Sequence, residues 1–195
     1  MARSLRIFIA LFLLVTLAPA GAAGLDAISA EESGGALRQA LSQGAVAAVS
    51  SLGRTDGFLG NPKVKILLPE NLQKAEKLMR KLGMGKYADE LILSMNRAAE
   101  AAVPEAKELL LNAVKQMTLQ DAKGILTGGD DSVTQYFKRT TSEPLTEKFL
   151  PIVRQATERV DLAQKYNRYA KQGAKLGLID KKDASLEAYV TQKAL

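Results

Sequence analysis

Residues 86–103 read KYADELILSMNRAAEAAV and carry the most regular pattern of the 195-residue chain. Apolar side chains recur there every three or four residues, at Tyr87, Ala88, Leu91, Ile92, Met95, Ala98, Ala99 and Ala102. This spacing places them along one face of an α-helix. We therefore predict an amphipathic helix over 86–103, with the face around Met95 at the centre of the core.

Helical spacing continues on both sides of this stretch, and Gly and Pro separate the segments. The pattern predicts helices over 36–52, 69–82, 104–117, 119–126, from 133 onward, 144–160 with kinks at Pro144 and Pro151, 162–176 and 186–195. Thr118 and Asp121 have the spacing of a capping box. Val64, Ile66 and Leu68 recur at every second position, with lysines at 63 and 65, so we expect one short extended arm packed across helices. The predicted fold class is all-α, a single-domain array of about seven to eight helices.

The composition excludes several kinds of chemistry. Hydrophobic residues make up 47% of the chain and aromatic residues 5%, and Cys, His and Trp are absent. Without Cys or His the chain cannot form a disulfide, a thiolate nucleophile, an ordinary structural zinc site or a Ser-His-Asp triad. We predict no metal site, no cofactor and no enzymatic activity.

The N-terminal residues have the pattern of a secretory signal peptide. Arg3 and Arg6 precede an apolar run over 7–17, and small residues at Ala18, Ala20 and Ala22 offer cleavage sites. The run is shorter than the roughly 20 residues that a membrane span requires. We predict a signal peptide over 1–22, a flexible leader over 23–35 and a helical domain over 36–195. The mature protein is then periplasmic, with no transmembrane span after cleavage.

The net charge is moderately positive. The formal charge of +6 falls to +4 when Arg3 and Arg6 are removed. Two groups of cations stand out: Lys74, Lys77, Arg80, Lys81 and Lys86, and then Lys171, Lys175, Lys181 and Lys182. They are interpreted either as solvated faces with interspersed acids or as contacts to anionic lipid or polysaccharide. No aromatic residues interleave with the lysines, which argues against nucleic acid as a partner.

Residues 124–137 read GILTGGDDSVTQYF. Gly128 and Gly129 follow the last apolar residue of one predicted helix, where a left-handed glycine commonly ends a helix. Asp130 and Asp131 precede Val133 and Tyr136, where an aspartate would accept hydrogen bonds from free backbone N–H groups. The stretch is therefore interpreted as a corner between helices, and the alternative is a cation or ligand site.

A second stripe lies beside the apolar face of the 86–103 helix. It consists of Asp89, Leu93, Asn96 and Glu100, and Arg97 neighbours Glu100. If another segment covers this flank, the polar groups must satisfy one another, since an unpaired buried group costs about 1–3 kcal/mol. Three interpretations stay open: a buried hydrogen-bond network, a polar floor for a ligand, and a solvated face.

The stretch from Ser94 to Val153 resembles a known bacterial family. The strings NRAAE at 96–100, DAKGIL at 121–126, GGD at 128–130, YF at 136–137 and FLP at 149–151 occur in family order. By these motifs the chain is similar to domain of unknown function 4197, whose members are exported or lipid-anchored envelope proteins. The resemblance implies an all-helical envelope protein and no particular activity. This chain lacks the lipobox Cys of anchored members. The family pattern continues past Leu195, so we expect the domain to lack one C-terminal helix.

These observations lead to one functional prediction and two alternatives. We predict a non-catalytic periplasmic protein that binds a partner protein, lipid or glycan of the envelope. One alternative is a carboxylate-dependent hydrolase or lyase acting on envelope glycans, with Glu100 and Asp130 or Asp131 in a cleft. The other is a carrier of an apolar ligand held between helices. The candidate ligand-binding residues are Asn96, Arg97, Glu100, Asp130, Asp131 and Tyr136.

Overall fold

The computed structural model describes residues 30–160, 163–168, 175 and 185–195. Within them, seven α-helices have defined bounds: α1 (Ala30–Leu52), α2 (Glu70–Lys81), α3 (Gly85–Ala102), α4 (Ala106–Gln116), α5 (Leu119–Thr127), α6 (Ser132–Thr157) and α8 (Leu186–Ala194). A 3-10 turn, η2 (Val103–Glu105), links α3 to α4, and residues 163–168 are also helical. The described residues contain no strand. The prediction of an all-α, multi-helix fold is confirmed.

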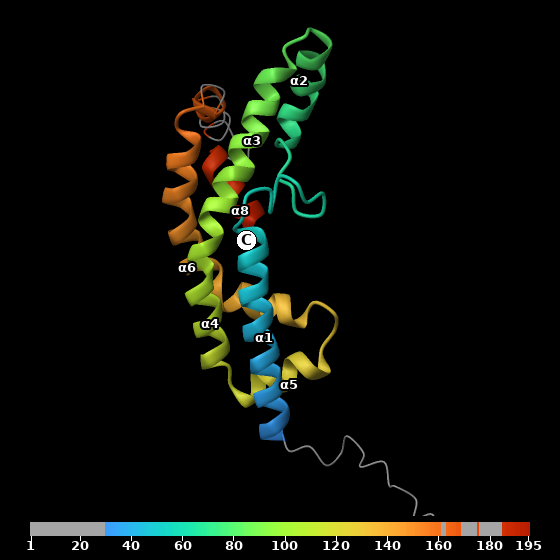
Figure 1. The fold of residues 1–195 in the computed structure, drawn as a ribbon, viewed down its shortest axis with the longest axis vertical. Coiled ribbons are helices and arrows are strands. Elements are labelled where there is room, and N and C mark those ends of the chain that lie inside the picture. The colour runs from blue at the N-terminus through green and yellow to red at the C-terminus, as the bar shows by residue number, and fades with distance from the viewer. Residues whose placement is uncertain (1–29, 161–162, 169–174, 176–184) are drawn as a thin grey trace, which may run out of the picture.

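The helices form an elongated array in which α3 occupies the centre of the upper half and α1 and α4 lie in the lower half (Figure 1). The apolar face of α3 packs against α6 and α8, and α2 packs beside α3. Leu91, Met95, Ala98, Ala99 and Ala102 are completely buried. Ala at three of these positions lets neighbouring helices approach closely. The predicted central face around Met95 is therefore confirmed, but Tyr87, which the helical spacing places on the same face, is exposed.

An irregular segment, residues 53–69, connects α1 to α2 and crosses α3. Ile66 and Leu68 are buried in the main hydrophobic cluster, together with Phe58. Residues 65–69 belong to no helix or strand, which agrees with the predicted extended arm. We call residues 61–69 the arm.

A second, smaller hydrophobic cluster lies in the lower half of the molecule. Ala113, Met117, Ala122 and Tyr136 form its buried part, and Leu37 and Leu41 of α1 pack against it. The predicted capping box is present, because Thr118 Oγ1 accepts from the Asp121 N–H and the Asp121 carboxylate accepts from the Thr118 N–H. This cap fixes the start of α5 beside the second cluster.

Two predicted boundaries differ from the structure, and a third falls partly outside the described residues. α1 begins at Ala30, six residues before the predicted start at 36, so Gly34 and Gly35 lie inside a helix. α6 is one helix from Ser132 to Thr157 and contains both Pro144 and Pro151. In Figure 1 its ribbon changes direction between the gold and the orange parts, as expected where a proline removes a helical N–H. The helix predicted over 162–176 lies partly outside the described residues.

Candidate functional site

Asn96 lies at the centre of the upper core and holds the arm against α3. Its side chain is completely buried. Asn96 Oδ1 accepts from the Ile66 N–H at 2.8 Å, and Asn96 Nδ2 donates to the carbonyl oxygens of Ile66 at 2.8 Å and Ile92 at 2.7 Å. The side-chain amide therefore pairs with both backbone groups of Ile66, as a neighbouring strand would.

Glu100, one turn further along α3, binds the segment that precedes the arm. Its Oε1 accepts from the N–H groups of Phe58 and Leu59, both at 3.0 Å. Its Oε2 accepts from Arg97 Nη1 at 2.6 Å, and Arg97 Nη2 also donates to Asp56 at 2.7 Å. Asn96, Arg97 and Glu100 thus direct their polar atoms at residues 56–66. Asn96 and Glu100 are buried and Arg97 is partly exposed, and their polar atoms are engaged in hydrogen bonds with this segment and with one another.

The ionisation of Glu100 follows from this network. Burial raises the pKa of its carboxyl, but hydrogen bonds from the Leu59 N–H, from Arg97 and from the Phe58 N–H lower it, and the net pKa lies below the ordinary value. A general acid in glycoside hydrolysis requires a raised pKa. The lowered pKa of Glu100 therefore does not suit the role of general acid.

Asp130 and Asp131 lie in the exposed turn between α5 and α6, in the lower half of Figure 1. No hydrogen bond or ion pair of the described residues joins them to Glu100. Asp131 is the N-cap residue of α6, but its side chain accepts no backbone hydrogen bond and instead accepts from Gln135 Nε2 at 3.1 Å. The predicted capping hydrogen bond is therefore wrong, although the stretch does form a corner between helices.

The predicted left-handed glycine in this turn is also wrong. Gly128 has φ −84° and ψ −177°, which is extended backbone, and among the described glycines a positive φ occurs at Gly83. Steric crowding explains the need for glycine at position 128 instead. A Cβ at Gly128 would lie 2.6 Å from the Gly124 carbonyl oxygen and would clash with the Ser132 hydroxyl. The turn therefore requires a residue without a side chain, for a steric reason rather than a conformational one.

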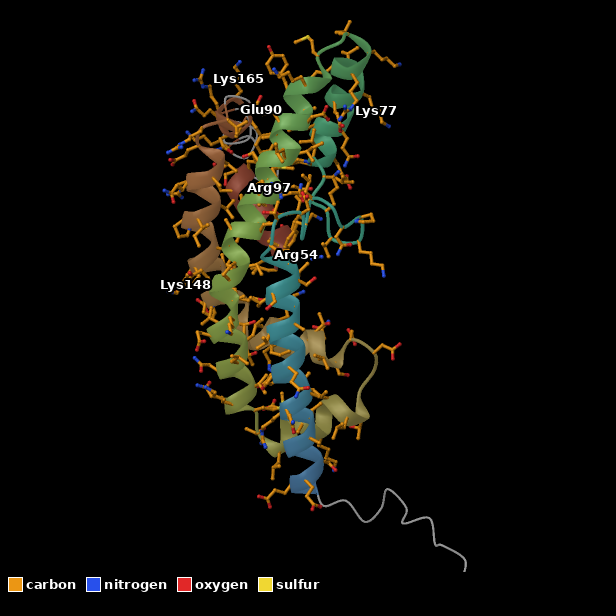
Figure 2. The ribbon with its side chains drawn as sticks, viewed as in Figure 1. Arg54, Lys77, Glu90, Arg97, Lys148 and Lys165 are labelled. Atoms are coloured by element: carbon orange, nitrogen blue, oxygen red, sulfur yellow. The ribbon has the colours of Figure 1, made fainter. Side chains whose placement is uncertain are left out.

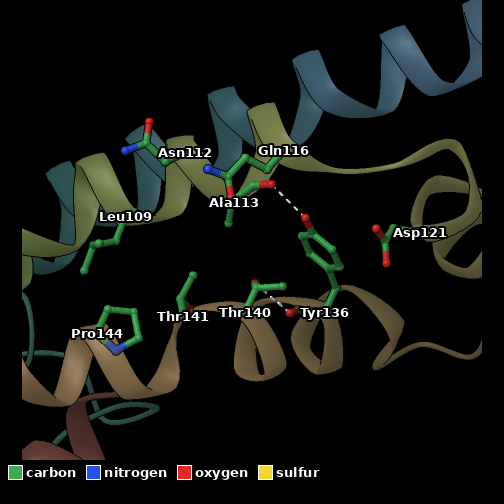
Figure 3. Close-up of a pocket in the computed structure, with 9 residues that line it drawn as sticks. All are labelled: Leu109, Asn112, Ala113, Gln116, Asp121, Tyr136, Thr140, Thr141 and Pro144. Atoms are coloured by element: carbon green, nitrogen blue, oxygen red, sulfur yellow. Dashed lines mark hydrogen bonds between the residues drawn. The ribbon is translucent and has the colours of Figure 1, made fainter.

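A pocket of about 380 Å³ lies between α4 and α6 and includes one residue of α5 (Figure 3). Its lining residues are Leu109, Asn112, Ala113, Gln116, Asp121, Tyr136, Thr140, Thr141 and Pro144. Three of them form a buried floor: Ala113, Tyr136 and Thr141. The rim carries the exposed side chains Asn112, Gln116 and Thr140. We call this feature the α4–α6 pocket.

Tyr136 is the predicted site residue that lines this pocket. Its hydroxyl donates to the Ala113 carbonyl oxygen at 2.7 Å (Figure 3). Burial and the nearby Asp121 carboxylate raise the pKa of Tyr136, while Arg139 and Arg38 oppose this. The guanidinium carbon of Arg139 lies over the Tyr136 ring, 5.6 Å from its centre, so the ring is contacted on its face as well as at its hydroxyl.

The charged groups at the pocket compensate one another. Asp121 accepts from Arg139 Nη2 at 2.7 Å and from the Thr118 hydroxyl at 2.7 Å. The hydrogen bonds from Thr118, followed by the attraction of Arg139, lower the pKa of Asp121. The pocket therefore offers a local ion pair without net charge, amides on its rim and a partly apolar floor.

No motif in the sequence marks the pocket residues Asn112, Gln116, Thr140 and Thr141. Asn112 and Gln116 are spaced four apart on α4, so they share a helix face. That spacing alone indicates a solvated face as readily as a site. The facing side chains come from α6, twenty or more residues away in the chain, and only the packing of α4 on α6 brings the two sets together.

Two properties of the described residues concern membranes and metals. No helix described in the structure combines the length and apolar character that a membrane span requires. Within the same ranges, no group of three or more Asp, Glu, His or Cys side chains is arranged to hold a metal ion.

Comparison with known proteins gives one match. Residues 27–195 match the family described as "Protein of unknown function (DUF4197)", which covers nearly the whole chain. No curated protein and no solved structure matches the chain.

Proposed function

The chain belongs to the DUF4197 family, whose description assigns no function, and from this premise we propose that it is a non-catalytic, exported binding protein of the cell envelope. We propose that the α4–α6 pocket holds a neutral, hydroxyl-rich ligand, namely a segment of an envelope glycan. The export component of this proposal rests on the signal-like pattern of residues 1–22.

Two exposed side-chain amides at the rim of the pocket support this proposal. Asn112 and Gln116 are exposed at the rim, and neither side-chain amide forms a hydrogen bond with another described residue. Each amide offers two donors and an acceptor to a ligand. A ligand rich in hydroxyl groups, each of which both donates and accepts, complements this arrangement.

The floor and the charge balance narrow the class of ligand. Tyr136, Ala113 and Leu109 supply apolar surface on which the carbon face of a sugar ring could rest. Asp121 and Arg139 form an ion pair, so these two groups together add no net charge at the pocket. The volume of about 380 Å³ lies in the range of ordinary small-molecule sites, roughly 300–1,000 Å³.

Binding is favoured over hydrolysis by the state of the carboxyl groups. The pKa of Glu100 is lowered, which is the wrong direction for a general acid, and the pKa of Asp121 in the pocket is lowered too. Glu100 is also engaged by two backbone N–H groups and by Arg97. A hydrolase acting through two carboxyls requires one that stays protonated.

Side-chain amide NMR tests the proposed ligand class. Neutral oligosaccharides, namely chitooligosaccharides and maltooligosaccharides, are titrated into the isotope-labelled protein, and the NH2 signals of Asn112 and Gln116 are followed. We expect these signals to shift on binding of at least one neutral series. The variants Asn112→Ala and Gln116→Ala should each weaken that binding, while Gln155→Ala, which removes an exposed amide elsewhere on α6, should leave it unchanged.

The same samples distinguish the alternatives. Cleavage of an oligosaccharide during the titration would contradict the non-catalytic assignment and support the hydrolase alternative. Shifts at Leu109 and Tyr136 with a fatty acid, but with no oligosaccharide, would support an apolar-ligand carrier. If no neutral oligosaccharide moves the Asn112 and Gln116 signals, the glycan proposal is wrong.

N-terminal sequencing tests export separately. We expect the protein recovered from the periplasmic fraction to begin between Ala18 and Gly24. Recovery of a mature protein that still begins at Met1 would contradict the proposed signal peptide.

A further inference from the structure

One end of the molecule carries apolar side chains that the fold leaves exposed. Leu78, Leu82, Met84 and Tyr87 expose 59, 66, 46 and 55% of their surface, and they lie within ten residues of chain around the turn between α2 and α3. We call residues 77–87 the helical tip, which lies at one extreme of the long axis in Figure 1. Single exposed apolar residues are ordinary, but such a concentration marks an interaction surface.

Lysines surround these apolar side chains. Lys77, Lys81 and Lys86 are exposed, and no acidic side chain among the described residues forms an ion pair with them. Figure 2 labels Lys77 at this end of the molecule. Two of the acids near the tip are already engaged, because Arg80 pairs with Glu76 at 2.9 Å and with Asp89 at 2.5 Å.

The turn itself is tightly defined. Gly83 has φ +76°, and it closes α2 with hydrogen bonds from the Met84 N–H to the Met79 carbonyl at 2.8 Å and from the Gly83 N–H to the Arg80 carbonyl at 3.2 Å. A Cβ at Gly83 would have no atom of the described residues within 4 Å, so the space beside this glycine is open in the part of the chain that the structure describes. The apolar and basic side chains are thus presented together on an ordered projection.

We propose that the helical tip docks on the surface of an anionic lipid bilayer. The four apolar side chains enter the boundary between headgroups and acyl chains, and the three lysines remain at the level of the anionic headgroups. Tyr87 suits this boundary because its ring is apolar and its hydroxyl is polar. The charge of the tip complements anionic lipid, and the mixture of apolar and basic groups matches the interface better than the acidic surface of a soluble partner. This contact is independent of the α4–α6 pocket.

A single tryptophan reports the contact, because the chain contains none. Met84→Trp places an indole on the tip, and Leu126→Trp places one at an exposed leucine of α5 as a control. Full-length protein is mixed with vesicles of phosphatidylethanolamine and phosphatidylglycerol, or of phosphatidylcholine alone. We expect the Met84→Trp emission to shift to the blue and to be quenched by brominated lipid in anionic vesicles. The Leu126→Trp emission should stay unchanged. The reporter position matters because residues 7–17 are apolar and could bind lipid themselves.

Matched charge variants test the role of the lysines. The triple variant Lys77→Gln, Lys81→Gln, Lys86→Gln is made in the Met84→Trp background. Each lost lysine should weaken binding about fivefold at low salt, so the triple variant should lose on the order of a hundredfold. The control Lys107→Gln, Lys115→Gln, Lys123→Gln removes the same charge from exposed positions on α4 and α5 and should leave the affinity within about twofold of the parent.

Three results would overturn the proposal. The first is a Met84→Trp emission that is the same with and without anionic vesicles. The second is equal insertion into neutral and anionic vesicles. The third is an equal loss of binding in the two triple variants, which would assign the interaction to net charge rather than to the tip. Insertion confined to anionic vesicles and lost in the tip variant alone supports it.

Discussion

Replacement of Asn96 by Ala removes the side chain that joins the arm to the centre of α3. The change breaks both hydrogen bonds between Asn96 and Ile66, each 2.8 Å long, and leaves the backbone N–H and carbonyl of Ile66 without these partners. The third bond, to the Ile92 carbonyl, matters less because that oxygen lies within α3 and accepts a helical hydrogen bond as well.

The expected loss can be worked out from the groups left unpaired. Each buried polar group without a partner costs about 1–3 kcal/mol, so the two groups of Ile66 sum to about 2–6 kcal/mol. Lys65 and Leu67 on either side of Ile66 are exposed, so the arm can shift and admit water. We therefore expect Asn96→Ala to lower the free energy of unfolding by about 2–4 kcal/mol.

Urea denaturation measures this loss, and limited trypsin digestion locates it. The arm contains Lys63 and Lys65, and both are exposed. Cleavage after these lysines should be faster in Asn96→Ala than in the wild type, because the arm is less firmly held. Asn112→Ala, which removes an exposed amide, should change stability by less than about 0.5 kcal/mol. An Asn96→Ala protein with the wild-type urea midpoint and the wild-type cleavage rate would refute this account of the arm.

Three further predictions concern Glu100, Ala99 and the turn before α6. Because the pKa of Glu100 is lowered in the folded state, its ionised form stabilises the fold above its ordinary pKa of 4.5, and this contribution is lost as the pH falls further. The stability difference between wild type and Glu100→Gln should thus shrink between pH 6 and about pH 3 in urea titrations, and a constant difference would contradict the assignment. Ala99 is completely buried, so Ala99→Phe should lower the free energy of unfolding by about 1–3 kcal/mol through overpacking. Unchanged thermal stability would mean that the helices around Ala99 move apart to accommodate the ring. Gly128→Val should lower the melting temperature more than Asp131→Ala, since a side chain at Gly128 meets the Gly124 carbonyl and Asp131 makes no backbone cap. The reverse order would restore the capping interpretation.

The sequence alone predicts the features that depend on neighbours within one or two helical turns. The apolar stripe centred on Met95 predicts the buried face of α3, because a period near 3.6 places those residues together on a helix whatever surrounds it. The capping box of Thr118 and Asp121 and the helix end at Gly83 are predictable for the same reason. Their hydrogen bonds connect residues no more than five positions apart.

Turn chemistry proved less predictable from residue type. The Gly-Gly-Asp-Asp stretch suits a left-handed glycine followed by an aspartate cap. In the structure the Gly128 backbone is extended, and the side chain of Asp131, the N-cap residue of α6, makes no capping hydrogen bond. The sequence indicates that the chain turns there, and it does not select the geometry. In this turn the Ser132 hydroxyl donates to the Gly129 carbonyl oxygen. Several neighbouring polar side chains can bond to the local backbone, and residue preferences alone do not tell which of them does so.

The tertiary structure alone decides what the polar residues contact. The sequence predicts that Asn96, Arg97 and Glu100 share a flank of one helix, but their partners at Phe58 and Ile66 lie 30 to 42 residues away. The α4–α6 pocket likewise joins Asn112 and Gln116 to Tyr136 across two helices. Periodicity specifies the face on which a side chain lies because it follows from the backbone of one helix. It cannot specify the segment that covers that face, because this depends on how all the apolar faces pack together.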